Sequence, residues 1–437
     1  MRKNLLVLIL CLLVLTPILA VDEDALFGSS FDDDLFGGDD FLVEDISETE
    51  IDLEQLMFTD ESGITLGGSY SFSITPGWSW DLDNETDKGT LETTLSTKLF
   101  FDARPSADIR VFGKAVISYP FDEVEDDLGT PLVNEQRTFS DILSIKELFS
   151  DFSIHDRLFL RVGKQTLNWG VGYFFSPADL LNLSEIDPSD PDKELEGPLS
   201  VKMNMPLGID NLYGYVMVPE DAKDITDVAV AVKYEKVIGK SELGFGAYYR
   251  NGQAPAAMVT LSSGIGDVSL FGEGMLSYGS DKKYQEKGSF PPTYYENPDD
   301  RFYFSATAGA NFTWNDKESD RSVTFATQYY YNGEGTNLNT VILIPFQNNG
   351  YHYGATSLSF ALTRKVTLGL FWYGNMEDLS GMVKPSVTWK PVDSVGINLT
   401  LNATYGDLGD EFTPLFGQSL GRTLGVSLGF TLGGANF

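Results

Sequence analysis

A two-residue hydrophobic period, starting near Gly63 and persisting to the C-terminus, is the feature that most limits the fold of this chain. In each segment, apolar side chains alternate with Gly, Ser, Thr or charged residues, as in a β-strand with one apolar and one polar face. After the N-terminus no run approaches the roughly 20 apolar residues that a spanning helix needs. We count about 18 such segments. The predicted strands are 64–74, 91–101, 109–118, 143–154, 157–166, 199–206, 211–218, 227–236, 241–250, 255–262, 267–277, 301–313, 321–331, 352–362, 365–374, 382–390, 394–404 and 424–433.

The connections between these segments alternate in length. The long ones are 75–90, 119–141, 167–198, 278–300, 332–350 and 405–423, and the short ones include 102–106, 155–156, 206–210, 315–320, 363–365 and 391–394. Outer-membrane barrels have short periplasmic turns and longer outer loops, whereas a soluble β-sandwich has no reason to keep this rhythm. The sequence therefore predicts an all-β fold, a transmembrane antiparallel β-barrel of about 18 strands, with 16 as the alternative.

The last predicted strand carries its apolar residues in one phase, from Leu424 to Leu432, and Phe437 falls in the other phase. Either a bulge at Gly433–Gly434 restores the face of the terminal aromatic residue, or the strand ends at Leu432. We favour the bulge. Aromatic residues near other strand ends, including Tyr353 and Tyr373, are expected in girdles at the membrane interfaces.

The N-terminal part has a different composition from the predicted barrel. Residues 1–20 have the basic start, the apolar core and the small residue at the end that are typical of a secretory signal peptide. Residues 21–61 contain 16 Asp and Glu and no Lys or Arg, with repeated Leu-Phe or Phe-Leu pairs. Such a segment buries too little surface to fold alone, so we expect an acidic, disordered periplasmic segment. The barrel domain would then cover 62–437.

Charge and residue usage exclude several classes of function. The formal net charge of −34 argues against a nucleic-acid partner. The only cysteine is Cys11, within the predicted signal peptide, so no disulfide or Cys-based metal site is expected. Neither histidine, His155 or His352, has a nucleophile motif around it. We predict no enzyme activity, no cofactor and no metal site.

The most distinctive motif runs from Arg161 to Asp179, RVGKQTLNWGVGYFFSPAD, at the end of a strand and the start of the longest loop. It resembles a Gly-Lys/Arg-Gln…Trp-Gly…Phe-x-Pro-x-Asp signature of porin-like Gram-negative outer-membrane barrel families. The resemblance covers about twenty residues. It implies that this segment folds toward the lumen and presents Gln165, Asn168, Trp169, Pro177 and Asp179. The segment is either a structural anchor of the loop or a constriction that sets the pore size.

Basic residues at the polar phase of neighbouring strands form a second candidate element. They are Lys98, Arg110, Lys114 and Arg161, with Lys202 as a further member. Acids of the long loop (Asp179, Glu185, Asp187 and Asp190) are expected to face them across the lumen. Such a transverse field orients polar solutes in a narrow pore. The alternative is that lumen-facing charges only pair with each other and hydrate the wall.

Together these features predict an outer-membrane channel of porin type, through which small hydrophilic solutes diffuse. The alternatives are a surface-exposed structural or adhesive barrel and a transporter of hydrophobic solutes whose N-terminal segment occludes the lumen. With an even strand number, both termini are expected in the periplasm. The expected partners are outer-membrane lipid, the barrel assembly machinery, which would engage the C-terminal strand, and a periplasmic protein that binds the acidic segment.

Overall fold

The computed structural model describes residues 63–436 apart from 84–85, 107, 120–141, 156, 168, 184–185, 192, 194, 220–221, 287–293, 317–319, 339–340, 342–347, 393 and 415–420. The predicted signal peptide and acidic segment lie outside the described residues, as do Phe437, Asn168 and Glu185.

Eighteen antiparallel strands form one sheet, which confirms the predicted fold class and the strand number. They are β1 (Ile64–Asp81), β2 (Thr86–Ser106), β3 (Ile109–Tyr119), β4 (Leu143–Ile154), β5 (Leu158–Lys164), β6 (Leu199–Leu207), β7 (Asp210–Val218), β8 (Ala229–Ile238), β9 (Ser241–Tyr249), β10 (Ala256–Ile265), β11 (Val268–Tyr278), β14 (Phe302–Asn315), β15 (Ser322–Tyr331), β16 (His352–Thr363), β17 (Val366–Asn375), β18 (Gly381–Val392), β19 (Val395–Tyr405) and β20 (Thr423–Asn436). Two short strands, β12 (Lys283–Gln285) and β13 (Tyr294–Glu296), form a separate hairpin in the connection between β11 and β14.

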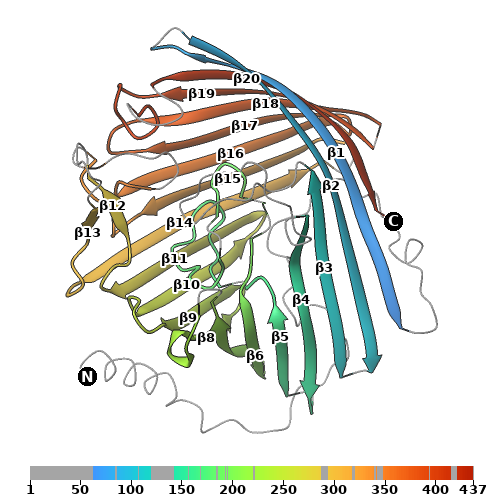
Figure 1. Ribbon diagram of the computed structural model, residues 1–437, viewed down its shortest axis with the longest axis vertical. Helices are drawn as coiled ribbons and strands as arrows, with labels where there is room; N and C mark the ends of the chain where they lie inside the picture. Colours follow the sequence, from blue (N-terminus) through green and yellow to red (C-terminus); the bar gives the residue numbers. More distant parts are fainter. Residues whose placement is uncertain are drawn as a thin grey trace.

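The sheet closes on itself because β1 pairs both with β2 and with β20. Figure 1 follows the wall from β1 in blue round to β20 in red, where the first and last strands lie side by side. Closure leaves no free sheet edge, so every strand of the wall has a hydrogen-bonded neighbour on both sides. A 3-10 turn, Ile225–Asp227, precedes β8. No helix in the described part of the chain is long and apolar enough to cross a membrane.

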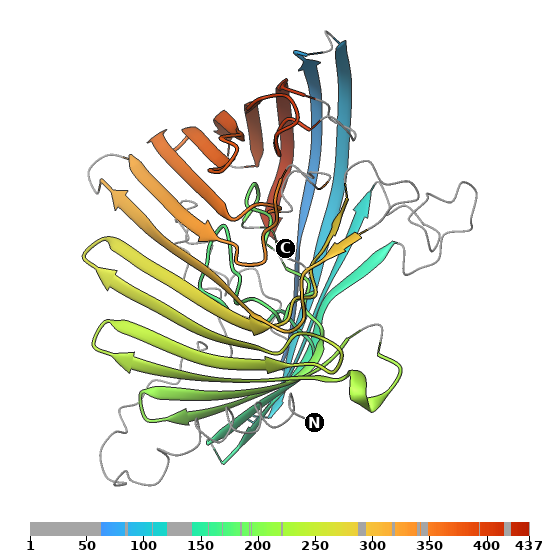
Figure 2. The ribbon, with the colours of Figure 1, turned by 90° about the vertical axis from the view of Figure 1, so that its left-hand side faces the viewer.

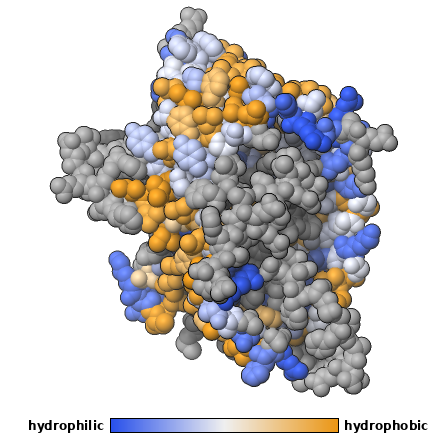
Figure 3. Space-filling view, turned by 90° about the vertical axis from the view of Figure 1, so that its right-hand side faces the viewer, coloured by the Kyte–Doolittle hydropathy of each residue, from blue (hydrophilic) through white to orange (hydrophobic). Residues whose placement is uncertain are grey.

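The outer face of the wall is apolar because the strands alternate in the predicted phase. Leu91 and Leu66 are among the most exposed, at 65% and 59%. Trp389 and Leu428 mark the same outward phase on β18 and β20. Figure 3 shows such exposed apolar residues, in orange, gathered in patches on the face it displays. A closed sheet with an apolar exterior is the architecture of transmembrane barrels.

The two ends of the barrel differ as the sequence predicts. The connections from β2 to β3, β4 to β5, β6 to β7, β8 to β9, β10 to β11, β14 to β15, β16 to β17 and β18 to β19 are short. We call the end of the barrel where they lie the short-turn end. The other side is the long-loop end, with connections such as 165–198 and 332–351. The tight hairpin turns of the yellow-green strands lie on the left of Figure 2. Residues 63 and 436 both lie at the short-turn end.

One predicted long connection, 75–90, is wrong. β1 and β2 continue as a paired hairpin to Asp81 and Thr86, so that only 82–85 join them. The reason is that Trp78, Trp80 and their neighbours keep the alternating phase, and β20 pairs with β1 as far as Asp81.

The expected bulge near the C-terminus is present. Ser71 of β1 pairs with Gly433, while the preceding Tyr70 pairs with Ala435, which leaves Gly434 as an extra residue on β20. Gly433 has a φ of +133°, a conformation that L side chains rarely adopt. The strand therefore continues beyond Leu432 to Asn436 through a glycine bulge.

Candidate functional site

The connection between β5 and β6, residues 165–198, folds into the barrel, and we call it the inner loop. Figure 1 shows it in green inside the wall, against the strands from β8 to β16. Gly163, just before it, has a φ of +144°, so this strand end is one of the places that require glycine. The two ends of the loop meet where the amide of Gln165 donates to the carbonyl of Pro198, at 3.3 Å. The inward course expected from the motif is thus present.

A buried carboxylate of the wall holds the first turn of the inner loop. Glu273 of β11 is 5% exposed and faces the lumen. Its Oε1 accepts hydrogen bonds from the amides of Val171 and Gly172, the latter at 2.5 Å. The hydroxyl of Ser176 donates to the same oxygen at 2.9 Å, and the amide of Ala178 donates to Oε2 at 3.1 Å. A buried carboxylate with this many donors is stabilised at its position, and so is the segment that supplies them.

A buried amide side chain, Gln328 of β15, holds the next residues of the loop. Its Oε1 accepts from the backbone amides of Tyr173, Phe174 and Phe175, at 3.1, 2.7 and 3.3 Å. Its Nε2 donates to the carbonyl of Phe175 at 2.6 Å and to Thr307 Oγ1 at 2.5 Å. These contacts fix the orientation of the Gln328 amide, because its oxygen meets only hydrogen-bond donors and its nitrogen meets only acceptors.

Trp169 anchors the loop in an apolar cluster on β7, β8 and β10. It is 1% exposed and lies edge-on to Tyr215, with ring centroids 5.2 Å apart. Gly246 of β9 leaves room for it, since a Cβ there would lie 2.8 Å from the indole ring. The buried members of the cluster are Leu167, Trp169, Ala178, Leu181, Tyr215, Met217, Ala229, Ala231 and Met258. Within the described structure, Trp169 Nε1 is buried without a hydrogen-bond acceptor.

A second cluster holds the aromatic turn of the loop against β15 to β18. Phe175 stacks on Tyr330 at 5.2 Å and contacts Tyr373 at 5.6 Å. Tyr353 and Tyr373 are fully buried, at 0% exposure, and face inward. The expectation that these two tyrosines belong to an interfacial girdle is therefore wrong. They occupy lumen-facing positions of their strands, where the loops cover them.

The connection between β19 and β20 also folds inward, around Glu411. This carboxylate is 0% exposed. It accepts from the amide of Asn349 at 3.0 Å and from the hydroxyl of Tyr353 at 2.7 Å. Burial raises the pKa of Glu411, and the hydrogen bonds from Asn349 and Tyr353 oppose that rise. The neighbouring Phe412 packs edge-on to Tyr373 at 4.9 Å, so the two inward connections share one aromatic cluster.

The predicted residues of the inner loop take different positions. Gln165 is 1% exposed, and its Nε2 donates to the carbonyl of Arg161 at 3.4 Å, while Trp169 lies in the wall cluster. Pro177 and Asp179 line a pocket. Asp179 accepts from Asn182 Nδ2 at 2.9 Å, and burial raises its pKa to about 6. Gln165 and Trp169 are thus buried, and Pro177 and Asp179 face open space.

The predicted basic stripe is in fact a row of alternating charge. Arg110 Nη2 lies 2.9 Å from Asp102 Oδ2, and Arg161 Nε lies 2.6 Å from Asp151 Oδ1. Arg110, Asp151 and Arg161 are direct cross-strand neighbours. Loop acids were expected to face these arginines across the lumen, whereas these two ion pairs are with acids of the wall. The register of β3, β4 and β5 places Asp151 directly opposite both arginines, which favours pairing within the wall.

The three predicted lysines extend this row without closing it into one basic surface. Lys202 is the cross-strand neighbour of Arg161, and its Nζ lies 5.4 Å from the centre of the Tyr213 ring. Lys114 lies opposite Glu147 on β4. Lys98 is exposed on β2, opposite Val116. The structure brings Arg110, Arg161 and Lys202 together and places Lys98 nearer the long-loop end.

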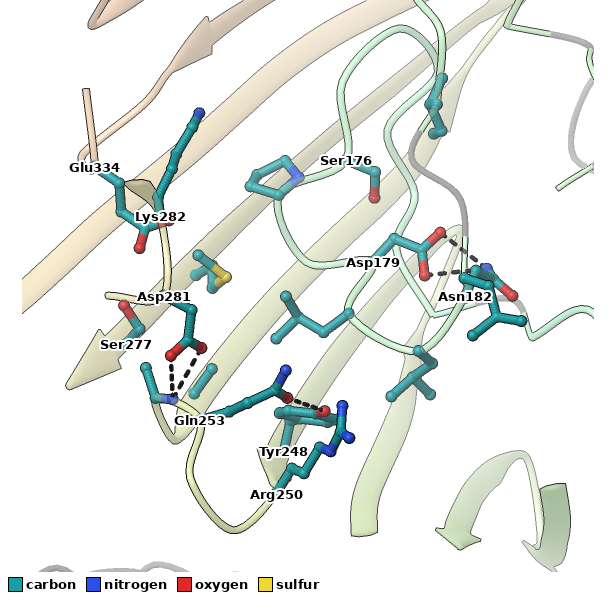
Figure 4. Close-up of a pocket in the computed structure, with 18 of the residues that line it drawn as sticks. Ser176, Asp179, Asn182, Tyr248, Arg250, Gln253, Ser277, Asp281, Lys282 and Glu334 are labelled. Carbon is teal, nitrogen blue, oxygen red and sulfur yellow. Dashed lines mark hydrogen bonds between the residues drawn. The ribbon is translucent and has the colours of Figure 1, made fainter. Parts of the chain in front are cut away.

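A pocket of about 580 Å³ lies between the inner loop and the wall at the long-loop end. Figure 4 shows Asp179 and Asn182 of the loop on one side and Arg250 and Gln253 on another, with Lys282 and Glu334 further along. Asp281 accepts from the amide of Ala254 at 3.0 Å, which fixes the connection between β9 and β10. The pocket therefore combines charges of both signs with apolar lining residues such as Leu181 and Met217.

Sequence reasoning missed the residues that hold the inward connections, which are Glu273 and Gln328 of the wall and Glu411 of the connection between β19 and β20. Glu273 carried a usable signal, since it is the only charged residue in Val268–Tyr278 and has the lumen-facing phase. Gln328 and Glu411 had no comparable signal, because their partners are distant in sequence.

No family model matches the chain, and no curated protein matches its sequence. Among solved structures, it is similar to OccK8 (OprE) of Pseudomonas aeruginosa, with a TM-score of 0.49 and 10% identity, over 85% of this chain and 98% of that one. It is also similar to OccAB1 of Acinetobacter baumannii, with a TM-score of 0.47 and 10% identity, over 85% and 97% of the two chains. The outer membrane channel DcaP of Acinetobacter baumannii gives a TM-score of 0.41 and 12% identity, over 86% and 99%.

Proposed function

We propose that the protein is an outer-membrane channel of porin type, through which small hydrophilic solutes diffuse passively, and that it has no enzyme activity. One observation carries this proposal: a closed 18-stranded wall with an apolar exterior encloses a polar interior that an inward loop narrows. An apolar exterior fits a lipid environment, and polar inward positions fit a water-filled lumen.

The inner loop would form the constriction. Gln165 and Trp169 act as its anchors, while Pro177 and Asp179 line the pocket between the loop and the wall. Arg110, Arg161, Lys98 and Lys114 would set the lumen charge, with Asp102 and Asp151 balancing the two arginines. The filter would thus combine the size of the gap beside the loop with a transverse field of alternating sign.

The short-turn end would face the periplasm, since outer-membrane barrels place their short turns there. Residues 63 and 436 lie at that end, which supports a periplasmic position for both termini. Residues 1–20 would be removed as a signal peptide, and 21–61 would remain as an acidic segment available to a periplasmic partner. The bulged last strand would be the part that the barrel assembly machinery engages.

The test is single-channel recording of the folded protein in a planar bilayer with a salt gradient. Discrete openings are expected, with a linear dependence of current on voltage, and the reversal potential reports the ion preference. A folded protein that never conducts would overturn the channel and leave a structural or adhesive surface barrel. A conductance that appears only after deletion of residues 21–58 would favour an occluded transporter of hydrophobic solutes instead.

A further inference from the structure

The inward face of the barrel is covered unevenly. The inner loop and the connection around Glu411 contact side chains from β7 round to β18, including Met258, Glu273 and Tyr353, all of them buried. On β19, β20, β1 and β2 the pattern is the opposite. Among their described residues, no lumen-facing side chain is buried. The described loops therefore fill one side of the lumen and leave the wall around the closing seam open.

On β1 between Thr65 and Ser79, and on β19 and β20, the inward positions of the open side carry hydroxyl groups, glycines and the amides of Asn398 and Asn402. Its inward positions on β1 include Ser71 and Ser73, and those on β20 and β19 include Thr431, Ser427 and Thr400. Ser73 pairs with Thr431, and Ser427 pairs with Thr400, so hydroxyl groups continue from strand to strand. We call the inward positions of β19, β20 and β1 the hydroxyl strip. From Thr65 to Ser79 on β1, and throughout β19 and β20, the described residues include no charged side chain.

Charged residues lie on both flanks of the strip. On β18, Lys384 and Lys390 have the inward phase, and on β2 Glu92 and Lys98 do. Lys384 is within electrostatic reach of Asp187 and Asp190 of the inner loop. The alternating row from Asp102 to Arg161 begins on β2, at Asp102. The neutral strip is thus a distinct surface between two charged borders.

We infer that the conducting route runs along the hydroxyl strip, and that it favours uncharged polyhydroxyl solutes over their charged counterparts. This inference rests on the proposed channel function. A hydroxyl group both donates and accepts, and its hydrogen can rotate toward either kind of partner. A row of such groups exchanges hydrogen bonds with a sugar-like solute at little cost, while it offers an ion no opposite charge to replace lost hydration.

Cysteine substitution tests the route, because Cys11 is the only native cysteine and Cys11→Ala gives a cysteine-free background. The strip variants are Ser73→Cys, Thr400→Cys and Ser427→Cys. Ala355→Cys is the matched control, since it faces inward on β16 at 0% exposure beneath the loops. The probes are two methanethiosulfonates, one with a quaternary ammonium and one with a sulfonate group.

We expect stepwise loss of single-channel current in each strip variant and opposite shifts of the reversal potential with the two probes. The control should keep its current. The route would be refuted if the strip variants were modified without a change in current, or if only Ala355→Cys were blocked. In either case the current of the untreated variants would still support the channel. An absence of current in every untreated variant would overturn both.

The solute class has its own readout. Swelling of proteoliposomes is compared in arabinose and in arabinonate, the five-carbon sugar acid that carries a carboxylate at C1. Faster swelling in arabinose supports the strip as the selective surface, and it should slow in Ser427→Asp. Equal or faster swelling in arabinonate would contradict the preference for uncharged solutes.

Discussion

Glu273 on β11 and Gln328 on β15 hold consecutive stretches of one loop from two places on the wall. Glu273 binds the amides of Val171, Gly172 and Ala178, and Gln328 binds those of Tyr173 to Phe175. The loop backbone between Val171 and Ala178 thereby finds its hydrogen-bond partners in wall side chains, which lets an irregular segment lie inside a barrel.

Replacing Trp169 should loosen the loop. Trp169→Ala removes a fully buried ring from the cluster around Tyr215, and core truncations of this size cost about 3–5 kcal/mol. We expect a lower midpoint of thermal unfolding in detergent and a larger conductance. Trp314→Ala is the control, because Trp314 faces outward and is 43% exposed. Equal effects of the two substitutions would argue against an anchoring role.

Removing Arg110 should shift ion selectivity toward cations. Arg110→Ala leaves Asp102 without its 2.9 Å partner and takes a positive charge from the row. The reversal potential in a salt gradient should move in the cation-selective direction, and Lys114→Ala in addition should move it further. Arg364→Ala serves as control, since Arg364 lies in a short turn at 80% side-chain exposure. If the reversal potential stays unchanged, the row has no part in selectivity.

The docking of the inner loop should weaken as pH rises. The pKa of Asp179 is about 6 in the folded protein and 3.8 ordinarily, so the folded state binds the proton more tightly. This stabilisation is complete below pH 3.8 and declines as pH rises through about 6. Because the side chain is partly exposed, we expect about 1 kcal/mol, less than the shift alone implies. Asp179→Asn should flatten the change of unfolding temperature between pH 4 and 8, and an unaltered profile would contradict this cause.

The glycine bulge should be needed for closure. Gly433→Val places a side chain at a φ of +133°, close to the backbone of Tyr70 and Ser71, and backbone strain of this kind costs about 1–3 kcal/mol. The folded fraction, measured by heat-modifiable gel migration, should fall. Gly425→Ala is the control, because a Cβ there meets nothing closer than 3.7 Å. Normal folding of Gly433→Val would show that the bulge is dispensable.

The fold was largely predictable because its determinants are local. Alternation of apolar and polar residues decides which face of each strand meets lipid, and connection length separates the two ends. The bulge at Gly433–Gly434 could be predicted because a shift in phase requires one extra residue. The prediction of a long loop at 75–90 failed because tryptophans in strand phase extend the hairpin there, although the same sequence is also compatible with a loop.

The site was predictable only in part because its contacts are long-range. The motif indicated an inward loop, but the hydrogen bonds that hold it come from Glu273 and Gln328, about a hundred or more positions away in the chain. Arg110 and Arg161 were placed on the correct face, yet their partners Asp102 and Asp151 became evident only from strand register. Phase gives the face of a residue, whereas register gives its neighbours.

The most direct test of the account compares single-channel conductance of the wild type and Glu273→Ala, both verified as folded. Loss of the carboxylate removes the acceptor for the loop amides and should release the loop, since each unpaired buried donor costs about 1–3 kcal/mol. We expect discrete openings in the wild type and larger ones in the variant. Absence of current in both, or equal conductance with the loop shown to be released, would contradict a channel that the inner loop narrows.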